Sequence, residues 1–218
     1  METLTRHYLA GLPRRRLHEG RNVTKAVVEV AEIEGRAIVL KDLVSRPWPV
    51  RLFLGPWQLD RETRAYARLR GVPGVPAFLG RIDRQAIALE FIPGRSLAAC
   101  RSGEIPPAFF DQLDRVVESV HARGVAHGDL HRHDVLVGTD GRPRLVDFST
   151  SLVADSGSTR ARRFVFEQMR RADLRSAARL RRRLVPERTL AIPPRPGLYR
   201  LGAPLRRLLD LVRGGSGH

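Results

Sequence analysis

The apolar positions in the first ninety residues are spaced as in short strands. Residues 23–33 are rich in β-branched side chains, and residues 37–40 form an apolar run, so both segments are predicted strands. Glu34-Gly35 between them is typical of a tight turn. Two further short strands are predicted at residues 77–79 and 86–91. The N-terminal half is therefore expected to be rich in β-structure.

A proline-rich segment and a helix separate these two pairs of strands. Prolines are dense between residues 44 and 58, which predicts an irregular segment there. Its aromatic side chains, among them Trp48 and Trp57, are expected to pack the segment onto the body of the protein. Residues 60–69 are a predicted helix, with Asp60 as its N-cap.

Helical spacing dominates the second half of the chain. Apolar residues recur at intervals of three and four within residues 106–123, and Gly124 is the predicted stop of that helix. Residues 160–184 show a rougher apolar stripe and are also predicted to be helical. A short last helix is expected at residues 205–212.

Between the two long helices lies a predicted hairpin. Residues 135–137 and 145–148 are short strand candidates, joined through Asp140-Gly141, a strong hairpin signal. The order of elements predicts an α+β fold with a sheet-rich N-terminal half and a helical C-terminal half. We expect the two parts to cover residues 1–92 and 93–218.

Composition narrows the choice of compartment and of partners. The 218 residues carry a formal net charge of +16, and nearly all the cations are arginine, since only Lys25 and Lys41 are lysine. A lone cysteine, Cys100, excludes a disulfide framework and a cysteine-rich zinc site. The N-terminus lacks an apolar signal-peptide core, and no apolar run reaches the roughly 18 residues of a membrane span. A cytoplasmic protein that attracts anionic partners is expected.

Three aspartates are the strongest chemical signal. Asp129 follows the long helix in a loop, Asp134 enters the first strand of the predicted hairpin, and Asp147 ends the second. The hairpin should bring them together, and clustered carboxylates repel one another unless a cation lies among them. Mg²⁺ takes one or two protein carboxylates together with phosphate oxygens, which suits this set.

The motifs around these acids resemble those of the protein-kinase-like superfamily. His127-Gly-Asp129-Leu130, three residues and Asp134 match its catalytic loop, and Asp147-Phe148-Ser149 matches its Asp-Phe-Gly motif. The resemblance is closest to small atypical branches, the lipopolysaccharide core (Kdo/heptose) kinases and the RIO kinases. It implies a two-lobed fold with a β-rich N-lobe and a reduced helical C-lobe.

The resemblance also implies a nucleotide site in the first half. Lys41 would hold the phosphates of ATP and pair with Glu62 on the next helix. Gly20 stands where a phosphate-covering loop is expected, although that loop usually has three glycines. The segment containing Glu90 and Ile92 resembles the hinge that receives adenine. Val39 and Leu136 are expected to line the adenine pocket.

The same resemblance implies which residues would carry out phosphate transfer. Asp129 would accept the proton of the acceptor hydroxyl, and Asp134 and Asp147 would hold Mg²⁺, or Mn²⁺ in its place. Asp134 replaces the usual Asn, and Ser149 replaces the usual Gly. Gly128 replaces the arginine that reads a phosphorylated activation loop in larger kinases, which argues against that mode of regulation. His127 is expected to be structural.

Other readings stay open at this point. A pseudokinase would bind nucleotide without turnover, and the resemblance of residues 128–131 to a metallophosphatase motif is superficial. The pair His131 and His133 could ligate a metal, and the arginines of residues 160–183 could form an anion-binding face. No recognisable motif supports a nucleic-acid partner. The expected acceptor is a hydroxyl of an envelope glycolipid or of a protein, with peripheral contact to an anionic membrane at its cytoplasmic face.

Overall fold

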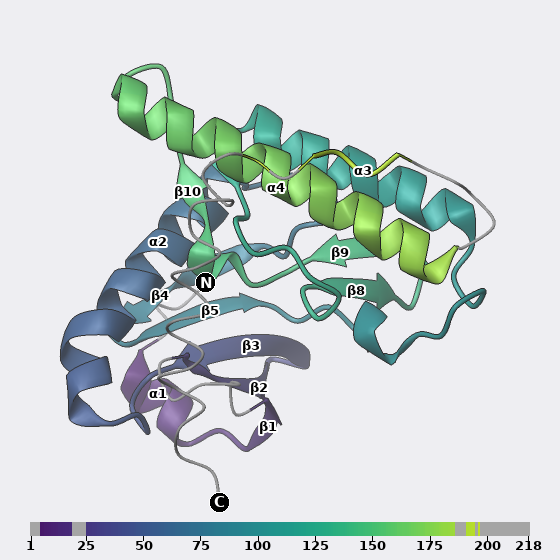
Figure 1. The fold of residues 1–218 in the computed structure, drawn as a ribbon. Coiled ribbons are helices and arrows are strands. Elements are labelled where there is room, and N and C mark those ends of the chain that lie inside the picture. The colour runs from purple at the N-terminus through teal and green to yellow at the C-terminus, as the bar shows by residue number, and fades with distance from the viewer. Residues whose placement is uncertain (1–4, 19–24, 186–190, 195, 197–218) are drawn as a thin grey trace, which may run out of the picture.

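The chain is an α+β protein, as predicted. A computed structural model describes residues 5–18, 25–185, 191–194 and 196. It contains an antiparallel sheet in the first half, and two long helices with small sheets in the second (Figure 1). Gly20 and the predicted helix at 205–212 lie outside the described residues.

The main sheet has five strands in the order β1-β2-β3-β5-β4, and every pairing is antiparallel. The strands are β1 (Arg14–His18), β2 (Val27–Ile33), β3 (Arg36–Asp42), β4 (Phe78–Asp83) and β5 (Ala86–Glu90). The predicted turn joins β2 to β3, with left-handed φ at both Glu34 and Gly35. Such a turn matches the twist of the two strands it connects.

The alternation of side chains along β3 gives the sheet two different faces. Ile38 and Leu40 are buried in a small cluster with Leu9 of helix α1 (Arg6–Ala10). Val39 and Lys41 point to the opposite face, because successive side chains of a strand alternate. That face carries the candidate site.

The proline-rich segment is helical, which corrects two predictions. A π-helix, η1 (Val50–Leu54), leads directly into α2 (Gly55–Arg68), so Asp60 lies inside the helix and is not its cap. Pro56 directly follows the π-type turn of η1, in which the Gly55 N–H bonds to the Val50 oxygen five residues back, so the regular α-helical bonding that a proline breaks is already interrupted there. Gly55 is required by packing, since a Cβ there would lie 2.3 Å from Leu43 Cδ1. The expected packing of Trp48 and Trp57 onto the body is also wrong, because both are mostly exposed.

The second half is built from two long helices and two small sheets. Helix α3 (Pro107–Ala122) and helix α4 (Arg160–Leu184) lie side by side (Figure 1), and their bounds agree closely with the predicted ones. The shorter elements are β6 (Gly94–Ser96), η2 (Leu97–Ala99), β7 (Val125–Ala126), β8 (Val135–Gly138), β9 (Pro143–Leu145), η3 (Phe148–Thr150) and β10 (Leu152–Val153). Strands β6-β8-β9 form one sheet, and β10-β7 form the other.

The predicted hairpin is present, but its second strand lies earlier than expected, at residues 143–145 instead of 145–148. Strand β9 ends at Leu145, and Asp147 adopts a left-handed backbone with φ of 65°. Phe148 therefore begins a 3-10 turn, where its ring is fully buried against Tyr66 of α2 at 5.2 Å. This break in the strand sets the direction in which Asp147 leaves the hairpin.

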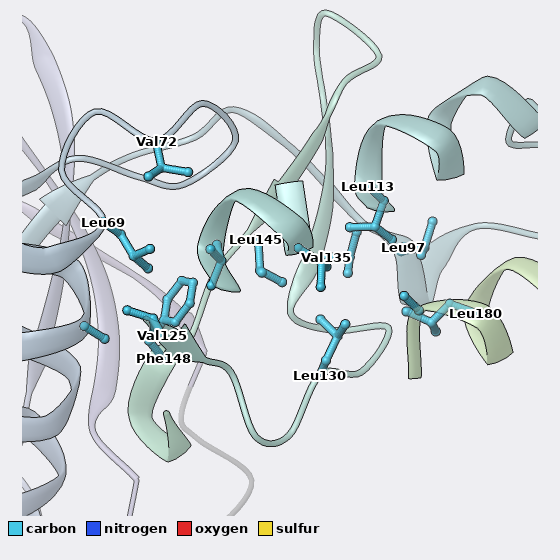
Figure 2. Close-up of a cluster of buried hydrophobic side chains, with 14 of the residues drawn as sticks. Leu69, Val72, Leu97, Leu113, Val125, Leu130, Val135, Leu145, Phe148 and Leu180 are labelled. Carbon is cyan, nitrogen blue, oxygen red and sulfur yellow. The ribbon is translucent and has the colours of Figure 1, made fainter. Parts of the chain in front are cut away.

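One apolar cluster connects the two halves. It runs from Leu69 and Val72, just after the end of α2, through Leu145 and Phe148, to Leu113 of α3 (Figure 2). Leu180 of α4 closes the far side of the same cluster. This apolar core therefore contains residues from both sides of position 92. The division of the chain into two lobes at residues 92 and 93 stays a prediction.

Candidate functional site

A cavity of about 480 Å³ lies between the main sheet, helix α2 and the β8–β9 hairpin. Its apolar wall includes Leu17, Ala26, Val28, Val39, Leu89, Phe91, Ile92 and Leu136. Its ionisable lining includes Lys25, Lys41, Glu62, Asp134 and Asp147. An apolar cleft with a few convergent charges is the usual form of a small-molecule site.

The first charged pair in this cavity joins β3 to α2. Lys41 Nζ donates a hydrogen bond to Glu62 Oε1, and both side chains are buried, Glu62 being only 2% exposed. Burial works to lower the pKa of Lys41, but the carboxylates of Asp147 and Glu62 outweigh it and hold that pKa well above its usual range. Burial raises the pKa of Glu62, and the nearby Lys41 offsets only part of that rise.

Asp147 accepts hydrogen bonds from both lysines of the chain. Lys41 Nζ lies 3.0 Å from its Oδ1, and Lys25 Nζ lies 3.1 Å from its Oδ2. Burial works to raise the pKa of Asp147, but the two ammonium groups outweigh it and hold that pKa well below its usual range. Asp147 therefore stays ionised at neutral pH.

Lys25 is a site residue that the sequence reasoning missed. It precedes β2, in a segment without a recognisable motif. One signal was present, because Lys25 and Lys41 are the only lysines among 39 basic residues. Lysine presents a compact point charge on a flexible stem and arginine a planar fork, so the two are not interchangeable at a binding site.

Asp134 lies on the opposite side of the hairpin base. Its backbone oxygen accepts a hydrogen bond from Val146 N at 2.8 Å, which ties the two acid-bearing segments together. Burial raises the pKa of its carboxyl group. The neighbouring His131 ring contacts that carboxyl group, which raises the pKa of the imidazole.

Asp129 has a different environment from the other acids. Its side chain is exposed, and it is not among the described residues that line the cavity. It does lie close enough to His131 to help raise the pKa of that ring. The structure therefore brings Lys41, Glu62, Asp134 and Asp147 to one cavity and leaves Asp129 on the adjacent loop.

Asp173 of α4 holds the backbone of the loop that carries Asp129. The sequence did not predict this role for Asp173. Asp173 is 1% exposed and accepts hydrogen bonds from the backbone N–H groups of His127 at 2.8 Å and Gly128 at 2.9 Å. Its carboxylate also lies 3.0 Å from His121 Nε2. A buried carboxylate with this many donors is well satisfied and fixes the loop's backbone.

His127 is placed as a packing residue, as expected. Its Nε2 lies 3.0 Å from the carbonyl oxygen of Val146, and its ring packs 5.0 Å from that of Phe148. It therefore connects the Asp129 loop to the segment of Asp147.

The expected nucleotide contacts fall on the apolar side of the cavity. Val39, Glu90, Ile92 and Leu136 all line it. Glu90 Oε2 accepts a hydrogen bond from the backbone N–H of Ala77, so this side chain fixes the strand end.

The donor set fits a magnesium ion held jointly with a phosphate. Two carboxylates, Asp134 and Asp147, reach one cavity, and Mg²⁺ needs only one or two from the protein. Within the described ranges, no group of three or more His, Cys, Asp or Glu side chains is arranged to hold a metal without further ligands. His131 and His133 lie with their rings 5.6 Å apart, edge to face.

Comparison with known proteins gives a partial match to kinases. No protein-family profile matches the chain. A 66-residue stretch is 35% identical to "3-deoxy-D-manno-octulosonic acid kinase" of Xylella fastidiosa strain M12, and equally to the protein of that name in strain 9a5c. The match covers 30% of this chain and 26% of each relative, so the chain spans about a quarter of the length of these curated relatives. It supports a distant, kinase-type relationship, while the resemblance to RIO kinases stays a prediction.

Among the described residues, no helix combines the length and the apolar composition that crossing a membrane requires.

Proposed function

We propose that this protein is an ATP-dependent phosphotransferase that moves the γ-phosphate of Mg-ATP to a hydroxyl group. The observation that carries the proposal is the row of charges Glu62–Lys41–Asp147–Lys25 in an apolar-walled cavity. Phosphoryl transfer depends on positioning and charge neutralisation more than on covalent chemistry, and this row supplies fixed charges of both signs. The partial similarity to a sugar kinase supports the same class of reaction.

The two halves of the chain would then act as the lobes of a kinase-like fold. The nucleotide base would lie between Val39 and Leu136, with its edge at the strand end of Glu90 and Ile92. Lys41 and Lys25 would bind phosphate oxygens, and Glu62 would orient Lys41. Asp134 and Asp147 would hold Mg²⁺, which when bound neutralises phosphate charge.

Asp129 would work on the acceptor. Its exposure on the loop beside the cavity suits a group that meets a second substrate arriving from solvent. It would take the proton of the attacking hydroxyl while the oxygen bonds to the γ-phosphorus and the bond to the β-γ bridging oxygen breaks, so that ADP leaves. The name of the relatives favours a sugar acid as acceptor. We propose that an envelope glycolipid carries it, with a protein Ser or Thr as the alternative acceptor.

A nucleotide-binding module without turnover is the second candidate. It is favoured by one observation, namely that Asp129 stands outside the described cavity lining. The two candidates differ in the fate of bound ATP.

Nucleotide binding and phosphate transfer test the proposal together. We expect ATP with Mg²⁺ to raise the melting temperature of the wild type, and Asp147→Asn to remove that rise. Asp129→Asn should keep the rise and lose transfer of labelled phosphate to a Kdo-containing lipid acceptor. Glu32→Gln, an exposed acid on β2, is the matched control and should change neither. A wild-type shift without transfer or ATP consumption would favour the binding module, and no shift at all would contradict both.

A further inference from the structure

An apolar surface on the helical segment before the cavity has no role in the proposed reaction. Trp48, Leu52, Phe53 and Trp57 are 67%, 59%, 67% and 57% exposed. We call these four side chains the apolar patch. They are four of the eight large apolar residues that are exposed in the described part of the chain, and they fall within ten consecutive positions.

The patch follows from the helical geometry of this segment. Trp48 and Leu52 are four residues apart, as are Phe53 and Trp57, and residues at this spacing share one side of a helix. Val50 and Leu59 of the same segment are buried and face the core. The segment is thus apolar on two sides, and its own fold covers only one of them. Exposed apolar clusters of this kind mark interaction surfaces.

The charges around the patch select an anionic partner. Between Asp42 and Asp60 the sequence has Arg46 and Arg51 and no acidic residue. Arg61 lies over the Trp57 ring at 4.6 Å, and its guanidinium is held by the backbone oxygens of Thr150 and Ser151, so it places a fixed positive charge beside the patch. The whole chain carries a formal net charge of +16. Tryptophan and phenylalanine beside arginine are the residues that favour the headgroup level of a bilayer.

We propose that the apolar patch docks on the surface of an anionic lipid bilayer, with the aromatic rings at the headgroup level and the basic surface of the chain facing the lipid phosphates. Apolar burial and electrostatic attraction then act together, and each alone gives only weak binding. The same helix carries Glu62 five residues after Trp57, or about 7.5 Å along the axis. Docking would therefore hold the cavity close to the membrane. Docking by this patch is inferred from the exposure of its side chains and the charge around them, and it does not depend on the proposed phosphotransfer.

The chain offers a site-specific reporter for this docking. Its only two tryptophans, Trp48 and Trp57, both belong to the patch. We expect vesicles of phosphatidylcholine and phosphatidylglycerol to shift the tryptophan emission of the full chain to shorter wavelength and to carry the protein in flotation. Vesicles of phosphatidylcholine alone should bind at least about tenfold more weakly, and added salt should weaken the anionic binding.

Two matched variants separate the patch from the general basic surface. Trp48→Ser with Phe53→Ser should reduce vesicle binding about tenfold or more, since both side chains are exposed and their loss should leave the fold intact. Phe164→Ser removes another exposed aromatic, 57% exposed on α4, and should leave binding unchanged. Equal binding by the double variant and the wild type would overturn the proposal in favour of nonspecific charge. A concentration-dependent emission shift without vesicles, matched by dimer formation in sedimentation, would overturn it in favour of a second copy.

Discussion

Lys25 donates a hydrogen bond to Asp147 at 3.1 Å across 122 positions of sequence. Because Lys41 contacts the other oxygen of the same carboxylate, both lysines of the chain meet at one acid. Two ammonium groups this close repel each other, and Glu62, which pairs with Lys41, supplies the second negative charge that balances them. We expect a chain of phosphates to bind at these two ammonium groups, with Mg²⁺ offsetting the negative charge that the phosphates add.

Removing the charge of Lys25 should weaken nucleotide binding. We expect Lys25→Met to lower the affinity for Mg-ATP by about tenfold, the loss of one charge-assisted contact. Isothermal titration would measure this. Arg36→Met, which removes one exposed cation from the far end of the same sheet, is the control and should bind as the wild type does. An unchanged affinity in Lys25→Met would show that Lys25 only partners Asp147.

Removing Lys41 should destabilise the fold in a pH-dependent way. Lys41→Met leaves Glu62 buried without its partner, which costs about 3–5 kcal/mol when the acid is ionised. Burial already raises the pKa of Glu62, and losing Lys41 raises it further. An acid whose folded pKa is raised favours the folded state below its unfolded pKa, and this advantage is lost as pH rises through the folded pKa.

Urea unfolding at two pH values checks this. The deficit of Lys41→Met against the wild type should be larger near pH 8 than near pH 5, in the direction that Glu62 ionisation dictates. Adding Glu62→Gln should remove most of the pH dependence, because no buried acid remains at that position. A deficit equal at both pH values would mean that Glu62 stays paired or solvated in the variant.

Much of the fold could be predicted because its signals are local. The apolar spacing of residues 160–184 lies within one helix, and the bounds of α4 agree with it. The Glu34-Gly35 turn depends on two residues, and both adopt left-handed φ. The acids at 134 and 147 flank a hairpin whose turn is also local, so their approach to one cavity followed from the sequence.

The missed features depend on tertiary contacts. The helix through Pro56 includes Gly55, whose lack of a side chain leaves room for Leu43, and no local pattern reveals this close approach. Trp48 and Trp57 have the apolar character of core residues, and only the fold shows that they face outward. Asp173 lies in a helix crowded with exposed charges, and its burial beneath the Asp129 loop depends on a contact across 45 or more positions.

Changing Asp173 should loosen the Asp129 loop. Asp173→Asn replaces one accepting oxygen with a donor that would face a backbone N–H of His127 or Gly128. A buried donor left without an acceptor costs about 1–3 kcal/mol, and more where a charged group was the partner. We expect a lower melting temperature and faster hydrogen exchange at the amides of residues 127 and 128. Asp155→Asn, an exposed acid in the turn before α4, should leave both unchanged.

The loop that carries Asp129 also requires a glycine at position 128. Gly128 has a φ of 84°, a conformation that costs an L-residue about 1–2 kcal/mol. A Cβ there would also lie 2.3 Å from Met169 Cε and 2.9 Å from the carbonyl oxygen of Thr150. The methionine can move, but the backbone oxygen cannot do so without shifting η3.

Gly128→Ala should therefore destabilise the protein and displace Asp129 beside it. Gly71→Ala is a matched control, because Gly71 has a similar φ of 76° and no heavy atom within 4 Å of its added Cβ. Both variants carry the cost of the left-handed backbone, so the difference between their unfolding free energies isolates the collision with Thr150. We expect Gly128→Ala to be the less stable by about 1–2 kcal/mol and to lose phosphate transfer while Gly71→Ala keeps it. Equal stability and activity in the two variants would mean that the loop adjusts to a side chain, and that Gly128 serves only its backbone conformation.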